Sequence, residues 1–309
     1  MLVLDRRQQR FEDRRFRDLP SFLHDGDCLV LNDSRVLPSR LFGVCENGGG
    51  AVELLLTEPV PDTDGDWRAL ARPGRKLGVG ARVRFDDTLT AVVLSRGERG
   101  ERVVRFEGTG DVYAALERLG HIPLPPYIRR ADSLEDRDRY QTVFARERGS
   151  VAAPTAGLHF TSETLASCRA AGASIAPVTL HVGLGTFQPV EREDFQNHQL
   201  HFERYSIPRQ SWETIQSAKR VIAVGTTAVR TVESAAAHEQ LSGSTNLFVY
   251  PGYSFCRVGA MLTNFHLPRT SLLLLVCAFA GTDLALAAYR HAVAQRYRFF
   301  SYGDCMLIV

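Results

Sequence analysis

Short apolar stretches separated by turn residues dominate the first third of the chain. After a buried-strand candidate at residues 28–31, such stretches lie at 40–43, 52–56, 67–70, 81–85, 90–94 and 102–106. Glycine-rich or proline-containing turns at 48–50, 73–74 and 78–80 separate several of them. Short strands at even spacing with glycine turns are typical of a small closed β-barrel. The pattern therefore predicts a barrel between residues 36 and 108.

Helices and strands alternate in the remainder of the chain. A helix is predicted at 111–119, ending at Gly120, and the three prolines of 121–128 predict an extended connector. Further helices are predicted at 161–172, 211–219, 227–238, 271–281 and 283–297, and strands at 175–181, 221–225 and 247–250. Such alternation is typical of a layered α/β domain of the three-layer sandwich type. We expect residues 1–35 and 109–309 to form a discontinuous α/β core domain, with the barrel of 36–108 inserted.

Charge and composition exclude several protein classes. The 309 residues carry 37 basic and 35 acidic side chains, which excludes a strongly basic nucleic-acid coat and an acidic disordered tail. Lys76 and Lys219 are the only lysines, so arginine supplies nearly all of the positive charge. Arginine binds phosphates with two parallel hydrogen bonds, although codon bias in a GC-rich genome gives the same composition.

The cysteines and apolar segments bear on location. None of the six cysteines forms a CxxC pair, so we expect buried thiols in a reducing compartment. The longest apolar run, residues 272–280, is shorter than the roughly 18 residues of a membrane span. No signal peptide is recognisable after Met1. The sequence predicts a soluble cytoplasmic protein.

Four loops carry groups that could bind or catalyse, and the first three of them also contain glycines. Their candidate residues are Thr155, Gly157 and His159; His181, Gly183, Gly185 and Thr186; Gly225, Thr226, Thr227 and Arg230; and Asn264 and His266. Glycines allow close backbone approach to a ligand, and free N–H groups at a helix start bind carboxylates. The alternatives are ordinary turns, a threonine N-cap, and an ion pair between Arg230 and Glu233 one turn away.

A further cluster has the composition of a metal site. His198, His201 and Glu203 lie within six residues, and imidazole with carboxylate suits zinc or a similar ion. The alternative is a hydrogen-bonded polar cluster near a substrate, which we favour because no further ligand is evident.

Eight segments, in order, resemble those of one family. They are 32–36, 120–128, 140–144, 151–160, 181–189, 221–230, 262–268 and 297–304. The chain resembles the S-adenosylmethionine:tRNA ribosyltransferase-isomerases of queuosine biosynthesis over essentially its whole length. The resemblance implies an α/β domain with an inserted β-barrel and no metal. It implies transfer and isomerisation of the ribosyl group of S-adenosylmethionine, a substrate here, to 7-aminomethyl-7-deazaguanine at the tRNA wobble position. The products are epoxyqueuosine-tRNA, adenine and methionine.

Membership in these segments assigns candidate roles. The acid–base candidates are His159, His181 and His266. The candidates for binding S-adenosylmethionine are Thr155, Gly157, Gly183, Gly185, Thr186, Gly225, Thr226, Thr227, Arg230 and Asn264. The candidates for tRNA contact are Arg129, Arg130 and Tyr302; the two arginines would otherwise pair with Asp132, Glu135 or Asp136. We expect a monomer, since no amphipathic oligomerisation stripe stands out.

One departure and two rival functions complete the sequence-based picture. Family members continue upstream of the position matching Leu2 with a Leu-Ile-Ala and a proline-rich block. We therefore expect either that the start codon is misassigned or that this chain lacks a segment that packs on the core or lines the site. The rivals are a metal-dependent hydrolase built on His198, His201 and Glu203, and a non-catalytic RNA-binding protein that uses the barrel.

Overall fold

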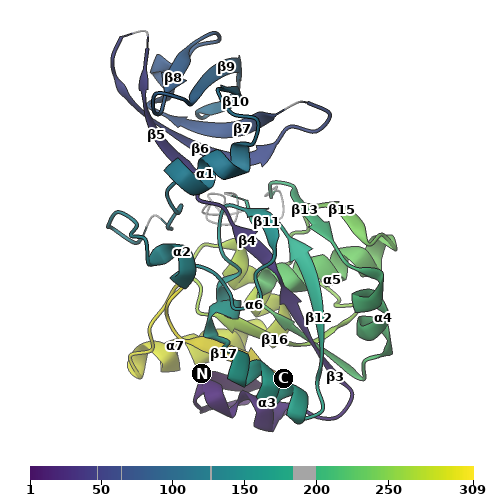
Figure 1. Ribbon diagram of the computed structural model, residues 1–309. Helices are drawn as coiled ribbons and strands as arrows, with labels where there is room; N and C mark the ends of the chain where they lie inside the picture. Colours follow the sequence, from purple (N-terminus) through teal and green to yellow (C-terminus); the bar gives the residue numbers. More distant parts are fainter. Residues whose placement is uncertain (47, 64, 126, 184–199) are drawn as a thin grey trace. The chain divides into compact units, whose positions relative to one another are not determined.

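The computed structural model describes residues 1–309 except 47, 64, 126 and 184–199, and of residue 76 only the backbone (Figure 1). The chain divides into two compact units. The first comprises Met1–Arg35, Gln141–Glu147 and Ala153–Val309, and the second comprises Val36–Tyr140 and Arg148–Ala152. The domain boundaries predicted from the sequence, 1–35 with 109–309 and 36–108, stay a prediction.

A nine-stranded mixed sheet forms the centre of the first unit. Its order is β15 (Ser242–Thr245), β13 (Glu203–Ser206), β12 (Ser174–Leu180), β3 (Asp27–Asn32), β14 (Arg220–Val224), β16 (Val258–Asn264), β17 (Cys305–Ile308), β1 (Leu2–Asp5) and β2 (Arg10–Asp13). The four central strands, from β12 to β16, are parallel. Every residue of β3 is buried, as a strand covered on both faces requires.

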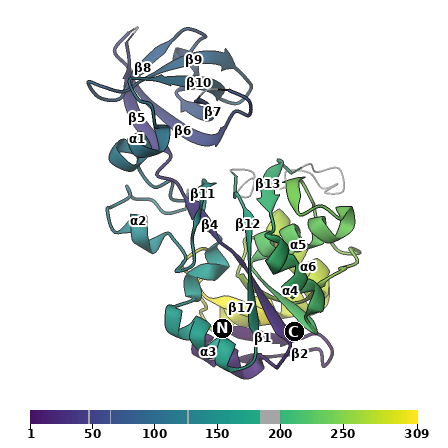
Figure 2. The ribbon, with the colours of Figure 1, turned by 45° about the vertical axis from the view of Figure 1, so that its right-hand side comes forward.

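Helices cover both faces of this sheet, as Figure 2 shows. One face packs on α3 (Ser162–Ala170) and on the 3-10 helices η1 (Phe16–Phe22) and η3 (Thr155–His159), through a core that includes Leu29, Leu31, Ile222 and Leu262. The other face carries α4 (Arg209–Ser217) and α5 (Thr226–His238). Two further helices, α6 (Ser271–Ala280) and α7 (Thr282–Ala294), follow β16. The predicted layered α/β fold is confirmed.

The second unit contains the predicted barrel, which is closed. Its order is β10 (Glu101–Glu107), β7 (Asp66–Arg72), β6 (Ala51–Pro59), β5 (Arg40–Cys45), β8 (Arg82–Arg84) and β9 (Thr90–Arg96). Alternate residues of these strands, including Leu41, Leu54 and Val93, fill the interior together with Leu116 of α1 (Val112–Leu119). Short η2 (Gly74–Lys76) and α2 (Asp136–Arg139) complete this unit. Two more strands, β4 (Ser34–Val36) and β11 (Glu147–Ser150), form a two-stranded sheet.

Gly120 ends α1 as predicted, for a steric reason. Its φ of −80° is one that any residue adopts, so left-handed backbone is not what it supplies. A Cβ at this position would lie 1.8 Å from the carbonyl oxygen of Pro38. The proline segment that follows contains no helix in its described residues and forms one isolated bridge, between His121 and Arg40. The segment turns at its end instead of staying extended as predicted, because the backbone N–H of Ile128 donates to the carbonyl oxygen of Pro125 at 2.9 Å. It lies inside the second unit rather than joining the units.

Two predictions about the first unit are wrong. Residues 247–250 form no strand; the strand lies just upstream, at Ser242–Thr245, because that polar stretch pairs with β13 at the sheet edge. Val249 is instead buried in an irregular segment. Of the six cysteines, all of them free thiols, Cys256 is exposed rather than buried.

The search for membrane spans has a limited result. Among the described residues, no single helix has both the length and the apolar composition to cross a membrane. The pair α6 and α7 meets those criteria of length and composition only when joined across a break bent by 115°.

Candidate active site

The carboxyl ends of the four parallel strands collect most of the predicted site residues. His181 follows β12, Asp33 follows β3, Gly225 follows β14, and Asn264 ends β16. Parallel strands end at one edge of a sheet, and ligands of open α/β folds bind there. The antiparallel strand β13 begins at the same edge, with Glu203. Segments far apart in the sequence therefore meet in one region.

His159, Thr155 and Asn264 are in direct contact. Nδ2 of Asn264 lies 3.3 Å from Nε2 of His159, and Oγ1 of Thr155 donates to Oδ1 of Asn264 at 3.4 Å. The same amide nitrogen donates to the carbonyl oxygen of Phe300 at 3.2 Å. Phe300 has a φ of +75°, an uncommon conformation for a residue with a side chain. Asn264 thus ties η3 to the turn that precedes β17.

The imidazole of His159 is held in apolar surroundings. Its ring centroid lies 5.3 Å from that of Phe16. Burial lowers the pKa of His159 to about 4, with smaller contributions from the positive N-terminus and Arg298. The ring is therefore neutral near pH 7.

His181 is a second neutral imidazole. Its backbone N–H donates to the carbonyl oxygen of Arg204 at 2.9 Å, which continues the pairing of β12 with β13. Nδ1 of its ring is buried and has no hydrogen-bond partner among the described residues. Burial, followed by the nearby Arg204 cation, lowers the pKa of His181 to about 4. A buried ring nitrogen without a partner is rare in folded proteins.

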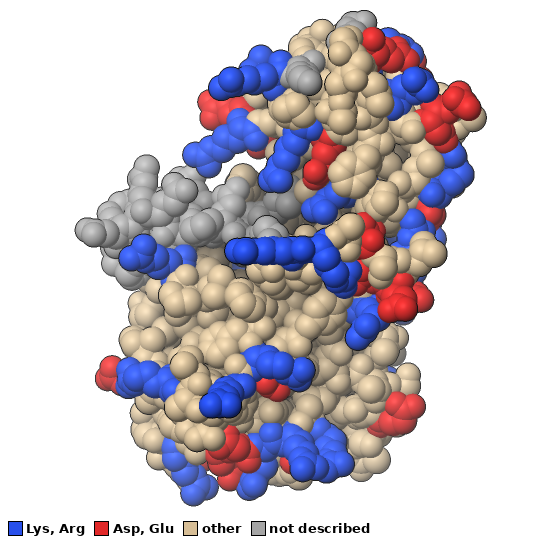
Figure 3. All heavy atoms as spheres, turned by 90° about the vertical axis from the view of Figure 1, so that its left-hand side faces the viewer, with Lys and Arg blue, Asp and Glu red and all other residues tan. Residues whose placement is uncertain are grey.

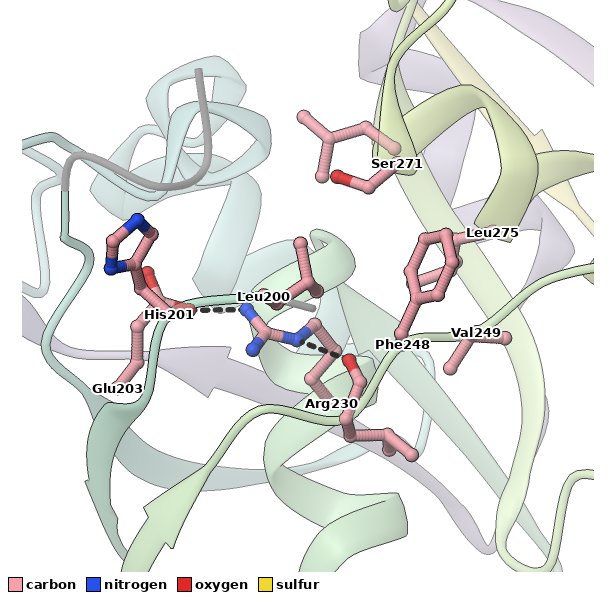
Figure 4. Close-up of a pocket in the computed structure, with 10 residues that line it drawn as sticks. Leu200, His201, Glu203, Arg230, Phe248, Val249, Ser271 and Leu275 are labelled. Atoms are coloured by element: carbon pink, nitrogen blue, oxygen red, sulfur yellow. Dashed lines mark hydrogen bonds and ion pairs between the residues drawn. The ribbon is translucent and has the colours of Figure 1, made fainter. Parts of the chain in front are cut away.

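A buried ion pair lies beside the turn after β12. Oε1 of Glu203 accepts the backbone N–H of Gly183 at 2.8 Å, and Oε2 accepts from Nη1 of Arg230 (Figure 4). Nε and Nη2 of Arg230 donate to the carbonyl oxygens of Leu247, at 3.0 Å, and Thr245, at 3.4 Å. Arg230 is predicted to bind S-adenosylmethionine, but three of its guanidinium nitrogens already donate hydrogen bonds within the protein.

The alternative pairing of Arg230 with Glu233 is wrong. The Glu233 carboxylate accepts the backbone N–H groups of Cys256, Arg257 and Val258 at 2.7 to 2.9 Å. Those three donors satisfy the carboxylate and direct it away from Arg230. The side chain holds the loop before β16.

A small cavity adjoins the ion pair. Its volume is about 20 Å³, close to the space for one water molecule. Figure 4 shows Ser271 and Leu275 of α6 across it from His201. The lining residues are Leu200, His201, Glu203, Arg230, Leu247, Phe248, Val249, Ser271, Leu272 and Leu275.

Gly225, rather than a threonine, is the N-cap of α5. Its φ of +89° strongly favours glycine, and its Cβ position would lie 3.5 Å from the Cβ of Ala156 in η3. Thr226 and Thr227 are buried and make no side-chain cap, so the threonine N-cap alternative is wrong. Oγ1 of Thr227 instead accepts from Nδ2 of Asn32 at 3.2 Å, which joins α5 to the end of β3.

Close packing around position 157 requires a glycine. A Cβ there would lie 2.7 Å from both Thr142 and Phe144 side chains. The small residue therefore lets η3 approach the segment 141–147. Its predicted contact with S-adenosylmethionine stays a prediction.

His266 bonds within the protein. Its Nε2 lies 2.8 Å from Oγ1 of Thr263, and its backbone N–H donates to the Tyr289 hydroxyl. Burial lowers the pKa of His266 to about 4. The His266 side chain bonds to Thr263 rather than to His159 or His181, so an acid–base role for it stays a prediction.

Sequence reasoning missed Asp33 at this edge. Oγ1 of Thr179 donates to its Oδ1 at 2.7 Å, and Nη2 of Arg146 donates to its Oδ2 at 3.0 Å. Burial raises the pKa of the Asp33 carboxyl despite these bonds. The available signal was a polar residue directly after an entirely buried strand.

Some predictions fall outside the described residues. They concern Gly185, Thr186 and His198. Glu203 of the proposed metal cluster pairs with Arg230 instead. Among the described residues, no three metal-ligating side chains come together.

The tRNA candidates lie in both units. In the second, Arg130 forms two hydrogen bonds with the buried Asp136, at 2.6 and 2.7 Å, as the ion-pair alternative foresaw. Arg129 is exposed there, and Tyr302 is 41% exposed in the first unit. On the face shown in Figure 3, basic side chains lie among acidic ones in each unit. Contact of these residues with tRNA stays a prediction.

Comparisons with known proteins connect this site to a family. Residues 1–308 match the model of a family described as queuosine biosynthesis protein. Proteins named S-adenosylmethionine:tRNA ribosyltransferase-isomerase from Solibacter usitatus, Syntrophus aciditrophicus and Natranaerobius thermophilus are 61%, 48% and 46% identical; each alignment covers 100% of this chain and 92% of the relative.

A solved structure adds the same fold. The crystal structure of an S-adenosylmethionine tRNA ribosyltransferase from Thermotoga maritima is 37% identical, with a TM-score of 0.54. The match covers 100% of this chain and 91% of that one. The resemblance drawn from the sequence is confirmed: the chain belongs to the queuosine biosynthesis protein family.

Proposed function

We propose that this chain transfers and isomerises the ribosyl moiety of S-adenosylmethionine onto 7-aminomethyl-7-deazaguanine at the tRNA wobble position. The products are epoxyqueuosine-tRNA, adenine and methionine. Relatives named S-adenosylmethionine:tRNA ribosyltransferase-isomerase match the whole chain. The structural observation that carries the proposal is the contact of His159 with Asn264 at the carboxyl end of β16, at the same edge of the sheet as His181.

The reaction needs a base, and His181 is the better placed histidine. A proton must leave the ribosyl carbon next to the sulfonium, whose positive charge acidifies it. A neutral imidazole with a free lone pair accepts such a proton. Nδ1 of His181 has no hydrogen-bond partner among the described residues, whereas Nε2 of His159 already contacts the Asn264 amide.

His159 suits the second role, assistance to the departing adenine. Its Nε2 accepts from the Asn264 amide, so the proton of the neutral ring resides on Nδ1. An N–H in apolar surroundings stabilises the negative charge that develops on a leaving purine more strongly than water would. Asn264 therefore fixes both the tautomer and the orientation of this donor.

We further propose that S-adenosylmethionine is the ribosyl donor and that no other cofactor takes part. The sulfonium activates the adjacent carbon by itself, and methionine leaves as a neutral thioether. The expected result is full activity after exhaustive chelation. Loss of activity that added zinc restores would contradict this part and favour the metal-dependent rival.

The decisive experiment measures free adenine and methionine by mass spectrometry. The protein is incubated with S-adenosylmethionine and tRNA that carries 7-aminomethyl-7-deazaguanine, with unmodified tRNA as the control. Adenine should appear in step with methionine and only with the modified tRNA. Replacement of His159 or His181 by alanine should reduce turnover by about 100-fold or more. Adenine release without the modified tRNA, or none with it, would contradict the proposal.

Location and assembly belong to the same proposal. We place the protein in the cytoplasm as a monomer, where its tRNA substrate is matured and where free thiols such as the exposed Cys256 persist. Fractionation and light scattering test these two points. A mass of twice 34.4 kDa would contradict the monomer.

A further inference from the structure

We propose that Glu203 is a positioning residue that holds the turn 181–183 in its reactive shape. The inference deepens the proposed function, because the turn begins with His181, the proposed base. Glu203 binds neither ring nitrogen of His181. It acts through the backbone N–H of Gly183, two residues further along, which its Oε1 accepts at 2.8 Å.

The carboxylate connects the turn to three rigid elements. Glu203 is the first residue of β13, and its Oε2 accepts from Arg230 in the second turn of α5. Arg230 in turn donates to the carbonyl oxygens of Thr245, at the end of β15, and Leu247. One buried pair therefore fixes the turn with respect to two strands and a helix.

The burial of both charges indicates that the Glu203–Arg230 pair does more than stabilise the fold. The side chains of Glu203 and Arg230 are only 4% and 7% exposed. The free energy needed to remove two charges from water is about as large as the free energy gained from their attraction. A protein with a well-packed apolar pair in the same place is therefore often equally stable. A buried pair is informative when it fixes one geometry, and here both partners bind backbone groups at the edge that carries the proposed site.

The position of the turn decides what surrounds His181. Its Nδ1 is buried without a partner among the described residues, so this nitrogen supplies no hydrogen bond that would orient the ring. Orientation must come from the backbone: the N–H of His181 donates to the carbonyl oxygen of Arg204 on β13. The bond from Gly183 to Glu203 is the second attachment of the same turn to the same strand.

The first test is Glu203→Gln. Glutamine keeps one oxygen but presents an N–H₂ group to either Gly183 or Arg230, so one of the two bonds is lost. We expect kcat to fall about 10- to 100-fold, because small displacements of a base are costly, with KM for S-adenosylmethionine changed less than about threefold. An unchanged kcat would overturn the proposal.

The matched control is a second buried carboxylate of the same sheet. Asp27, at the start of β3, pairs with Arg220, at the start of β14, so this pair lies at the opposite edge. Asp27→Asn removes a comparable charge from a comparable pair. It should lower the melting temperature while leaving kcat unchanged; an equal loss of kcat in both variants would assign Glu203 to general stability and overturn the proposal.

A double variant covers the case in which Glu203→Gln folds poorly. Glu203→Leu with Arg230→Met replaces the pair by apolar side chains and leaves no unpaired buried charge. We expect the melting temperature to stay within about 5 °C of wild type while kcat still falls about 10-fold or more. A stable double variant with wild-type kcat would overturn the positioning role.

A spectroscopic measurement separates this inference from the proposed function. NMR of imidazole-labelled protein follows the titration of His181, whose pKa burial and the cation of Arg204 lower. In Glu203→Gln the released turn should admit water, and the pKa of His181 should rise toward the ordinary histidine value. A titration identical to wild type overturns the inference, even if the wild-type protein released no adenine at all.

Discussion

Asn264 at the end of β16 donates its side-chain N–H to Nε2 of His159 in η3, across a distance of 3.3 Å. The bond joins residues 105 positions apart in the sequence. An amide nitrogen only donates, so the histidine nitrogen must accept and the ring must be neutral. The low pKa of His159, which burial causes, agrees with that state.

Replacement of Asn264 by aspartate should favour the charged form of His159 instead of the neutral one. A carboxylate beside Nε2 favours the imidazolium, so the pKa of His159 should rise by about 1 to 3 units. NMR titration of the histidine measures the shift, and turnover near pH 7 should fall because the ring becomes charged. Thr155→Val, which removes the donor to the amide oxygen without adding charge, is the control. An unchanged titration of His159 in Asn264→Asp would contradict the assigned bond.

The three buried histidines should make stability depend on pH. Burial lowers the pKa values of His159, His181 and His266 from 6.5 to about 4 in the folded protein. Between these two values the unfolded chain binds more protons, so the free energy of unfolding should fall as pH drops from about 7 to 4. Each proton contributes up to about 1.4 kcal/mol per pH unit.

Denaturant unfolding at several pH values checks this dependence. His266→Gln should reduce the slope by up to one proton, and comparison with wild type cancels contributions from other groups such as Asp33. A slope in the variant equal to that of the wild type would show that His266 titrates normally in the folded state.

Gly157→Ala should destabilise the first unit. The added methyl group would lie 2.7 Å from the Thr142 and Phe144 side chains, so η3 or the segment 141–147 must shift. Overpacking of this kind costs about 1 to 3 kcal/mol, measured by chemical denaturation. Gly78→Ala is the control, because nothing lies within 4 Å of its Cβ position. Wild-type stability with lost binding of S-adenosylmethionine would instead assign Gly157 to the ligand alone.

Arg129 and Arg130 should respond differently to replacement by alanine. If Arg129 contacts a phosphate, its loss should weaken tRNA binding and reduce the slope of log K against log salt by about 0.7 to 0.9. Arg130→Ala should also destabilise the second unit, because it leaves the buried Asp136, whose pKa the guanidinium lowers to about 2, without its cation. Salt titrations of tRNA affinity and thermal melts distinguish the two. Equal salt slopes for wild type and Arg129→Ala would exclude the contact.

Local patterns predicted the elements that carry their own apolar signature. The six barrel strands, α3 with Thr161 as its N-cap, and the apolar α6 follow from alternation, capping residues and an apolar run, all properties of neighbouring residues. The four-residue strands β1, β13 and β17 were missed, because four residues contain too little pattern to identify a strand. Their pairing within the sheet makes them strands.

The sequence by itself determined the layered fold, the barrel and the loops in which chemistry is expected. Only the tertiary structure decided which of those residues act on one another: Asn264 on His159, Glu203 on Gly183 and Arg230, Asp33 on Thr179. The contacts of Asn264 and Asp33 depend on the parallel order of β12, β3, β14 and β16, and those of Glu203 depend on the antiparallel pairing of β13 with β12. Helical and strand periodicity record which face of an element is buried, but they do not record the neighbour that covers it.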